Sequence, residues 1–337
     1  MWSSLKLPSF SHFRSSTPSA NDTSAVMLPL SHLYISDDSA ASCKYHKYFC
    51  NVDQGFSALL MMSSKIYIIV GAGAFGASTA LELKRTDPSA EVLLLDGGNQ
   101  PNTFSASHDV NKIIRSDYGN IFYMKLSLDA QERWRNDPIY KAYYHQPGML
   151  YAVGFDLGKT YIDNYEKLGA EHASEFLGPE EARTRFSGIF RDANWTDVKE
   201  NYFNPRSGWG EATGALTSLI KAAVDEGVKF RTVTVSKLLF SNSNDCVGVS
   251  LEGGEELRAD NVLLSVGAWT PLLLANSAPD NQLLQAGDRM VAAAALQCTA
   301  KYHPEEAEKF KDAPVIVNTM PHTNGKSLSE IIIKEHL

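Results

Sequence analysis

Cysteine is scarce in this chain of 337 residues, and its four cysteines are too scattered for a disulfide framework. Cys43 and Cys50 flank His46, but a structural metal site needs more ligands at closer spacing, so we expect no bound metal. No apolar run approaches the roughly 20 residues of a membrane-spanning helix. We therefore expect reduced thiols, no membrane association and an intracellular location.

Basic charge is also in deficit, with 31 Lys and Arg against 39 Asp and Glu and a net charge of −8. Such a chain has no general attraction to phosphate backbones, so nucleic acid is not an expected partner. Hydrophobic residues at 44% and charged residues at 21% exclude a wholly disordered or collagen-like chain. The length exceeds the needs of a typical domain and predicts two packed units.

Residues 1–62 differ in composition from the rest. The stretch from Trp2 to Ser24 is rich in Ser and Thr and carries no acid before Asp22, which faintly resembles a transit peptide. The alternative is a disordered or mis-predicted extension, with Met61 and Met62 as sensible start sites.

Ordered structure is expected from Lys65 onward. Ile66–Val70 is short, apolar and β-branched, and it ends at a glycine, as is typical of a strand buried on both faces of a parallel sheet. Residues 77–84 are good helix formers, and 91–96 (EVLLLD) predicts a second buried strand. Strand, helix and strand together predict a βαβ unit.

Later segments continue this α/β pattern. We expect a helix capped by Thr213, ending at Gly227, with one apolar face made of Leu216, Leu219, Ile220, Ala223 and Val224. After it we expect a strand over 228–235, a hairpin turning at 253–254, a buried strand over 262–266 and a helix opening at Thr270-Pro271. Residues 148–201 lack this pattern and predict a separate substrate-facing unit.

The strongest motif is Gly71-Ala72-Gly73-Ala74-Phe75-Gly76, which follows a predicted strand and opens a predicted helix. Asp96 ends the next strand, 20 residues beyond the last glycine. This is the dinucleotide fingerprint in its required context. The first glycine permits a sharp turn, the second lets the backbone approach a pyrophosphate, and Asp96 can accept hydrogen bonds from ribose hydroxyls. The alternative is a glycine-rich turn without a ligand.

The fingerprint alone does not choose between FAD and NAD. Lys112 and Arg115 follow it and, on a helical turn, would share a face. Two cations beside a cofactor can hold a substrate carboxylate or stabilise negative charge on a reduced flavin. A solvated basic edge is the alternative.

Six segments point to one family: GAGAFG at 71–76, VLLLD ending at 96, SHDVNKIIRSDY at 107–118, YFNPRSGW at 202–209, LLSVGAWTPLLL at 263–274 and EEAEKFKDAPVIVN at 305–318. With them, roughly residues 65–337 resemble the FAD-dependent amine oxidases of the D-amino acid oxidase superfamily. The similar branch is that of sarcosine oxidase and fructosyl amino acid oxidase (amadoriase).

The resemblance implies an α/β fold with two interleaved domains. A Rossmann-like FAD-binding domain would comprise 63–118 and 200–275, and an α+β substrate domain would comprise 119–199 and 276–337, incomplete at the C-terminus. The implied cofactor is FAD. The implied reaction takes a hydride equivalent from the carbon beside a secondary amine, such as a fructosyl amino acid, saccharopine or sarcosine. The imine then hydrolyses, and molecular oxygen is reduced to hydrogen peroxide.

The resemblance also implies roles for individual residues. Residues Gly71, Ala72, Gly73, Ala74, Phe75 and Gly76 would hold the FAD pyrophosphate, and Asp96 would hold the adenosine ribose. Ser107, Asp109 and Lys112 would lie along the flavin, with Arg115 near its ring or the substrate carboxylate. Gly267, Ala268 and Trp269 would pass close to the cofactor. We also expect Lys112 and Arg115 to contribute to catalysis.

The chain departs from the family pattern near its end. The family continues past Leu337 with a closing strand and a glycine-rich loop. No cysteine follows Cys298, so the predicted FAD is non-covalent. Lys301 is the candidate for an oxygen-activating lysine, with a surface lysine as the alternative. The expected location is cytoplasmic or peroxisomal, although the last three residues fit a peroxisomal signal poorly. The rival interpretations are an NAD(P)-dependent dehydrogenase and an inactive, truncated FAD-fold protein.

Overall fold

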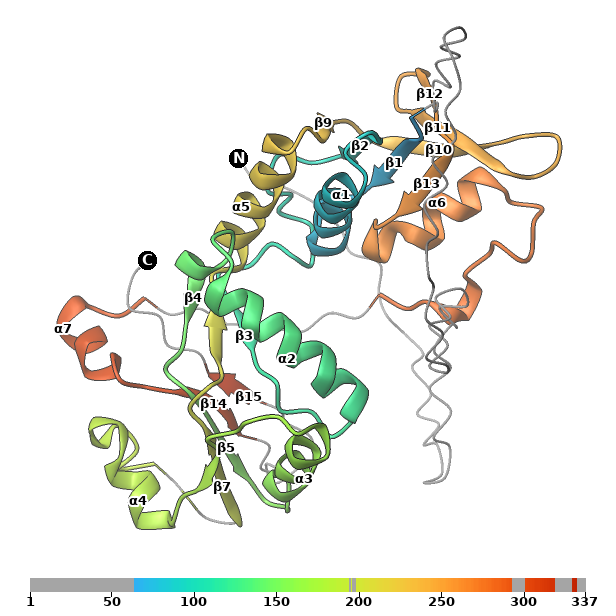
Figure 1. Cartoon of the computed structure of the whole chain (residues 1–337). Coiled ribbons are helices and arrows are strands. Elements are labelled where there is room, and N and C mark those ends of the chain that lie inside the picture. The colour runs from blue at the N-terminus through green and yellow to red at the C-terminus, as the bar shows by residue number, and fades with distance from the viewer. Residues whose placement is uncertain (1–63, 194, 196–197, 293–300, 319–328, 332–337) are drawn as a thin grey trace, which may run out of the picture. The chain divides into compact units, whose positions relative to one another are not determined.

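The computed structural model describes residues 64–193, 195, 198–292, 301–318 and 329–331. The predicted N-terminal extension, residues 1–62, lies outside the described residues. The described residues all belong to one unit of the chain, Met61–Leu337, and their helices and strands are drawn in colour in Figure 1. Within the described residues, no helix combines the length and the apolar character that a membrane span requires.

A four-stranded parallel sheet forms the first half of this unit. Its strand order is β13 (Asn261–Leu264), β1 (Ile66–Val70), β2 (Glu91–Asp96) and β9 (Lys229–Thr232). Helix α1 (Ala74–Thr86) connects β1 to β2, so the predicted βαβ unit is confirmed. The helix begins three residues earlier than expected because it starts directly from the glycine turn, with Gly73 as its N-cap.

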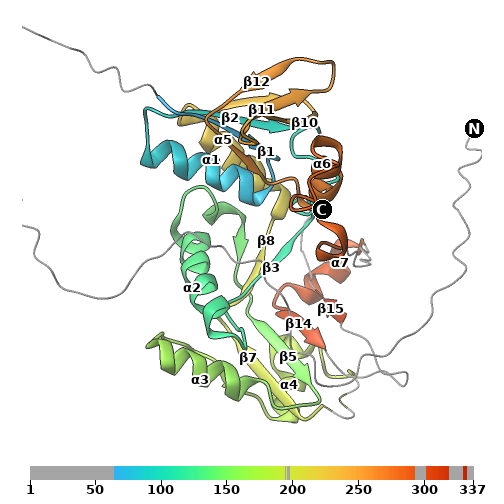
Figure 2. The same ribbon diagram turned by 90° about the vertical axis from the view of Figure 1, so that its right-hand side faces the viewer.

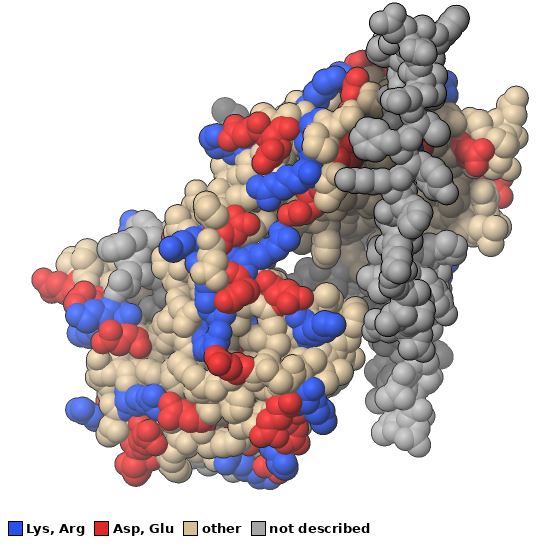
Figure 3. Space-filling model, viewed as in Figure 1, with Lys and Arg blue, Asp and Glu red and all other residues tan. Residues whose placement is uncertain are grey.

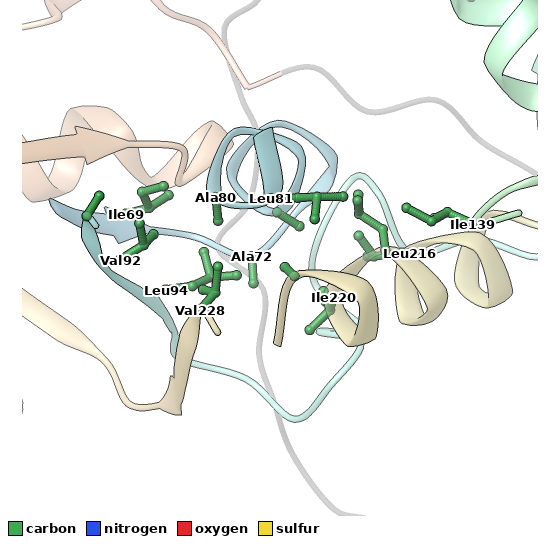
Figure 4. Packing of buried hydrophobic residues seen from close by; sticks show 14 residues of the cluster. Ile69, Ala72, Ala80, Leu81, Val92, Leu94, Ile139, Leu216, Ile220 and Val228 are labelled. Carbon is green, nitrogen blue, oxygen red and sulfur yellow. The ribbon is translucent and has the colours of Figure 1, made fainter. Parts of the chain in front are cut away.

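Helices α1 and α5 (Ala212–Asp225) pack together over one face of the parallel sheet. Ile69 and Leu94 project from the strands into the core that these helices cover (Figure 4). Of the predicted apolar face of α5, the first four residues are buried. The prediction that Val224 belongs to this buried face is wrong, since the residue is 44% exposed. Val224 comes eight residues after Leu216. Because 3.6 residues make one turn, eight residues exceed two full turns by about 80°, so its side chain points away from the buried face.

A second layer covers the opposite face of the parallel sheet. It is the antiparallel sheet of β10 (Val235–Phe240), β11 (Cys246–Leu251) and β12 (Glu256–Arg258), with helix α6 (Thr270–Ser277) beside β10 (Figure 2). Ile68, Val70 and Leu95 meet this layer in a second buried cluster. The predicted hairpin is confirmed, whereas the predicted strand over 228–235 divides between β9 and β10.

A five-stranded sheet organises the second half of the unit. Its order is β15 (Ser329–Ile331), β14 (Val315–Asn318), β5 (Met149–Val153), β7 (Glu200–Asn204) and β6 (Glu175–Phe176). Helices α2 (Ile121–Asn136) and α3 (Gly158–Leu168) pack on one face, where Tyr151 and Tyr202 are buried. Helix α4 (Pro179–Thr184) packs on the other face.

A small antiparallel sheet begins at Lys112, which is one of the predicted site residues. Its order is β3 (Lys112–Ile114), β8 (Gly208–Gly210) and β4 (Tyr144–His145). The remaining short elements are α7 (Pro304–Ala307) and the 3₁₀ turns η1 (Lys141–Tyr143), η2 (Phe186–Gly188), η3 (Gly267–Trp269), η4 (Gly287–Arg289) and η5 (Glu308–Phe310). The predicted domain boundaries stay a prediction; β7, inside the range expected for the FAD-binding domain, pairs with β5.

Candidate functional site

The order of the parallel strands reverses at β1. The chain runs outward from β1 through β2 to β9, and it returns later to place β13 on the other side of β1. The carboxyl ends of β1 and β13 are joined there by a hydrogen bond of 2.7 Å from Ser265 N to Val70 O. In open α/β sheets, ligands bind outside the carboxyl ends of the strands at such a reversal. The glycine turn starts at this point.

The glycine turn packs against the end of β13 without room for side chains. Gly71 has a φ of +99°, and a Cβ on it would lie 2.4 Å from Ser265 O. A Cβ on Gly76 would lie 1.8 Å from Gly71 O, so the helix can start close behind the strand only with glycine. A Cβ on Gly73 would lie 3.1 Å from Ser107 Oγ and 3.4 Å from Ser105 Oγ, a tight fit, and the approach of a ligand to this backbone stays a prediction.

The N-terminus of α1 lies at the glycine turn of residues 71–76, which we call the glycine cradle. Its N-cap, Gly73, provides no side-chain hydrogen bond to the first turn. The amide of Ala74 donates to Ser107 Oγ at 2.9 Å, so Ser107 lies at the turn itself. Ala74 and Phe75 are exposed, Phe75 by 85%. The positive end of the helix dipole at this exposed N-terminus favours a bound phosphate.

Asp96 joins the glycine turn to the loop after β2. Its Oδ2 accepts a hydrogen bond from Ala72 N at 2.8 Å, and its Oδ1 accepts from Gly98 N at 3.0 Å and Asn102 Nδ2 at 2.8 Å. The residue is 8% exposed. A carboxylate has about four acceptor positions, so these three bonds leave capacity for a ribose hydroxyl. The role of Asp96 towards ribose stays a prediction.

The loop after Asp96 contains a side chain that sequence reasoning missed. Both amide atoms of Gln100 are buried without a hydrogen-bond partner among the described residues. Buried polar atoms are normally paired, so an unpaired amide four residues beyond Asp96 suits a ligand with donors and acceptors, such as an adenosine group. This loop, the glycine cradle and the α1 N-terminus together fit FAD. No local pattern marks Gln100 in the sequence.

Asp109 and Lys112 lie over the start of α5. Lys112 Nζ is 2.5 Å from Asp109 Oδ2. The carbonyl of Asp109 accepts hydrogen bonds from Thr213 N at 3.2 Å and Thr213 Oγ1 at 2.7 Å. The prediction that Thr213 caps α5 is therefore wrong: the helix begins earlier, with Glu211 as its N-cap, and the threonine hydroxyl makes a tertiary contact instead.

The expected helical turn over Lys112 and Arg115 is also wrong. Residues 112–114 form β3, with Lys112 opposite Gly210 and Ile114 opposite Gly208. The two isoleucines favour a strand, and strand geometry removes the shared face that a helix would give. Arg115 points to a different environment from Lys112: it donates to the Tyr151 hydroxyl at 3.0 Å, and its guanidinium lies 4.7 Å from the centroid of the Tyr118 ring.

The remaining predicted site residues lie after β13 and near α7. Gly267, Ala268 and Trp269 form η3, directly after the carboxyl end of β13, and all three are exposed, Trp269 by 61%. Lys301 is exposed and precedes α7. Among the described residues it forms no hydrogen bond or ion pair with any other predicted site residue. The roles proposed for these four residues stay predictions.

A glycine turn, a helix N-terminus and Asp96 meeting where the strand order reverses define the class of dinucleotide-binding α/β proteins. Within that class, the chain belongs to the FAD dependent oxidoreductase family, which matches residues 67–326. The predicted family and the predicted α/β fold class are confirmed. FAD is the cofactor that the family name gives.

Several relatives are known by activity or structure. L-saccharopine oxidase of Schizosaccharomyces pombe is 29% identical over 269 residues, which are 75% of this chain and 60% of that protein. A thermally stable mutant of fructosyl peptide oxidase has 28% identity and a TM-score of 0.60, covering 76% of this chain and 60% of its own. Fructosyl peptide oxidase from E. terrenum has 27% identity and a TM-score of 0.59, covering 76% and 59%. The chain thus spans about 60% of the length of these relatives.

Proposed function

We propose that this protein is an FAD-dependent oxidase acting on the C–N bond of a secondary amine. Its substrate class would be amino-acid derivatives, such as fructosyl amino acids, saccharopine or sarcosine-like compounds, and its co-substrate molecular oxygen. The observation that carries the proposal is the glycine turn with Asp96 at the strand reversal, in a chain of the FAD dependent oxidoreductase family. The names of the relatives, an L-saccharopine oxidase and fructosyl peptide oxidases, support the substrate class.

The reaction would remove two electrons and two protons from the CH–NH group and leave a C=N bond. Water would hydrolyse the imine, and molecular oxygen would take up the two electrons and two protons as hydrogen peroxide. When bound, FAD supplies the two-electron acceptor between the amine and oxygen. We propose non-covalent attachment. In support, Cys246, which is the one cysteine within the described residues, lies in β11, outside the segments that we predict to contact FAD.

The chain's own residues would bind and orient the reactants. The α1 N-terminus would hold the pyrophosphate, and Asp96 and Gln100 the adenosine. Arg115 would bind a substrate carboxylate, because its guanidinium is already oriented by the Tyr151 hydroxyl. Lys112, whose ammonium group forms an ion pair with Asp109, would place a positive charge along the flavin. Lys301 remains the proposed lysine for oxygen.

The proposed partners are the small amine and oxygen. Figure 3 shows acidic and basic side chains interspersed over one face of the molecule, without a large field of one sign on that face. A face of this kind has no extended positive potential that would attract a polyanion such as nucleic acid. A cytoplasmic or peroxisomal location stays part of the proposal.

The test is to purify the full chain and to measure its absorption spectrum and its release of hydrogen peroxide. We expect the yellow absorption of oxidised flavin, flavin that is released when the protein is precipitated with acid, and peroxide with fructosyl-valine, saccharopine or sarcosine. A colourless protein that binds NADH would contradict the proposal in favour of a dehydrogenase. Flavin binding without turnover of any amine would support the inactive alternative.

A further inference from the structure

Asp117 is the most completely buried carboxyl group of the described residues, with 0% exposure. Its Oδ1 accepts hydrogen bonds from Tyr202 Oη at 2.9 Å and Tyr165 Oη at 3.2 Å. Asn204 Nδ2 lies 2.9 Å from each of its oxygens, and Ser207 Oγ donates to Oδ2 at 3.2 Å. All four partners are neutral side chains, so hydrogen bonds rather than an ion pair hold this carboxyl.

Such a group is a poor source of stability. Burial raises the pKa of the Asp117 carboxyl, and the hydrogen bonds from Asn204 and Tyr202 oppose that rise. Removing a carboxyl group from water without a cationic partner costs free energy, and its hydrogen bonds offset that cost only in part. A fully connected polar network does, however, fix geometry more sharply than apolar packing, because hydrogen bonds are directional.

The network fixes the backbone next to Arg115. Ser116, between Arg115 and Asp117, is 1% exposed, and its hydroxyl bonds to Gln131 Oε1 at 2.9 Å and to Tyr165 Oη at 2.8 Å. Ser116 and Asp117 therefore tie the segment after β3 to helix α2, helix α3, strand β7 and the turn that follows β7. Arg115 is the residue immediately before this anchored pair.

The network also contacts, through Tyr202, the tyrosine that binds the Arg115 guanidinium. The Tyr202 ring, whose hydroxyl bonds to Asp117, packs against the Tyr151 ring with their centroids 5.7 Å apart. Tyr151 in turn accepts the hydrogen bond from the Arg115 guanidinium. Both Tyr151 and Tyr202 are almost fully buried, at 1% and 0% exposure, so they cannot move independently of each other.

We propose that Asp117 is a positioning residue that places the Arg115 guanidinium for a substrate carboxylate. It acts through the anchored backbone on one side and through Tyr202 and Tyr151 on the other. The inference rests on the proposed function, which makes Arg115 the carboxylate-binding group. A binding group must stay within about 0.5 Å of its productive position, and supporting hydrogen bonds provide that accuracy.

The test compares Asp117→Asn with Asp129→Asn in the full chain loaded with FAD. Asp129 is an exposed aspartate on α2, so the control makes the same substitution at the surface. The probes are N-acetylglycine and its neutral amide, N-acetylglycinamide, which differ only in the carboxylate. Calorimetry gives the two dissociation constants, and their ratio is the acid preference. We expect Asp117→Asn to lower the acid preference about tenfold, since a hydrogen bond to a charged group is lost or misaligned, and Asp129→Asn to leave it unchanged.

A double-mutant cycle separates positioning from general loss of structure. Arg115→Ala should abolish the acid preference, and Asp117→Asn added to Arg115→Ala should change it no further. Should Asp117→Asn fail to fold, Tyr202→Phe takes its place, because it keeps the ring and removes one hydrogen bond to Asp117; we expect about a threefold lower preference.

The outcomes distinguish the inference from the proposed function. An unchanged acid preference in Asp117→Asn, or in Tyr202→Phe where that variant replaces it, overturns the inference while leaving the oxidase proposal intact. A wild-type protein with no acid preference also overturns it, because Arg115 then binds no carboxylate. A wild-type protein that binds no flavin and releases no peroxide refutes the oxidase proposal itself.

Discussion

Gly73 shows at the scale of one residue why the fingerprint needs glycine. A Cβ at this position would lie 3.1 Å from Ser107 Oγ and 3.4 Å from Ser105 Oγ, directly beside the α1 N-terminus. We predict that Gly73→Val abolishes FAD binding, because the two added methyl groups occupy the path of the pyrophosphate. The measurement is the ratio of flavin absorbance to protein absorbance after gel filtration.

The matched control is Gly119→Val. Gly119 is exposed, and a Cβ on it would meet no atom within 4 Å. This variant should keep the flavin content of the wild type. Full flavin occupancy in Gly73→Val, with an unchanged melting temperature, would contradict the assignment of the turn.

Asp117 gives a prediction about pH. Because burial raises the pKa of this carboxyl in the folded chain, the folded state binds its proton more tightly than the unfolded state. Folding then gains stability from Asp117 below the ordinary aspartate pKa of about 3.9 and loses it as pH rises through the raised value. The free energy of unfolding of the wild type, relative to Asp117→Asn, should therefore fall as pH rises from about 4.

Urea denaturation at a series of pH values between mild acid and neutrality measures this difference. Asp129→Asn is again the control, since an exposed carboxylate should give a difference that barely changes with pH. A difference that grows with rising pH would show that the folded chain holds Asp117 with a lowered pKa.

The limits of sequence reasoning are clearest for residues whose partners are remote in the chain. The turn from Gly71 to Gly76 and Asp96 could be predicted because strand, glycines and acid have a fixed local spacing. Asp117 could not, because Tyr202 and Ser207 are 85 and 90 positions away. Thr213 was misassigned for the same reason, since its carbonyl partner is 104 positions earlier.

At the scale of elements, long buried strands were more predictable than short ones. β1 and β2 have the predicted bounds because a continuous apolar run ending in a glycine or an acid is a clear signal. β3 has three residues, and the spacing of Lys112 and Arg115 suggested a helical turn that the β-branched Ile113 and Ile114 disfavour. A short segment takes its conformation from its neighbour, here β8.

Helix α5 allows a test of the layer that covers the parallel sheet. Leu219 is 3% exposed in the cluster with Leu94, whereas Val224 on the same helix is 44% exposed. We predict that Leu219→Ala lowers the free energy of unfolding by about 2–5 kcal/mol through lost burial and a cavity. Val224→Ala should change it by less than about 1 kcal/mol. Chemical denaturation measures both, and equal effects would contradict the packing described for α5.

At the scale of the whole molecule, the cofactor should stabilise the fold that binds it. The site uses the ends of β1 and β13 and the loop after β2, which exist together only in the folded chain. Free FAD at 100 times its dissociation constant should therefore add about 2.7 kcal/mol to the free energy of unfolding. NAD⁺ at the same concentration serves as the control and should add nothing. A rise in melting temperature with NAD⁺ but not with FAD would point to the dehydrogenase alternative.

The place of β13 beside β1 also has a consequence for biosynthesis. The hydrogen bond from Ile66 N to Asp260 Oδ2 links positions 194 residues apart, and the pairing of Tyr67 with Asn261 begins next to it. A ribosome adding 5–20 residues per second needs roughly 10–40 s between making these two strands. Throughout that interval the nascent β1 presents an open hydrogen-bonding edge, so chaperone binding to the emerging polypeptide would shield it until its neighbour arrives.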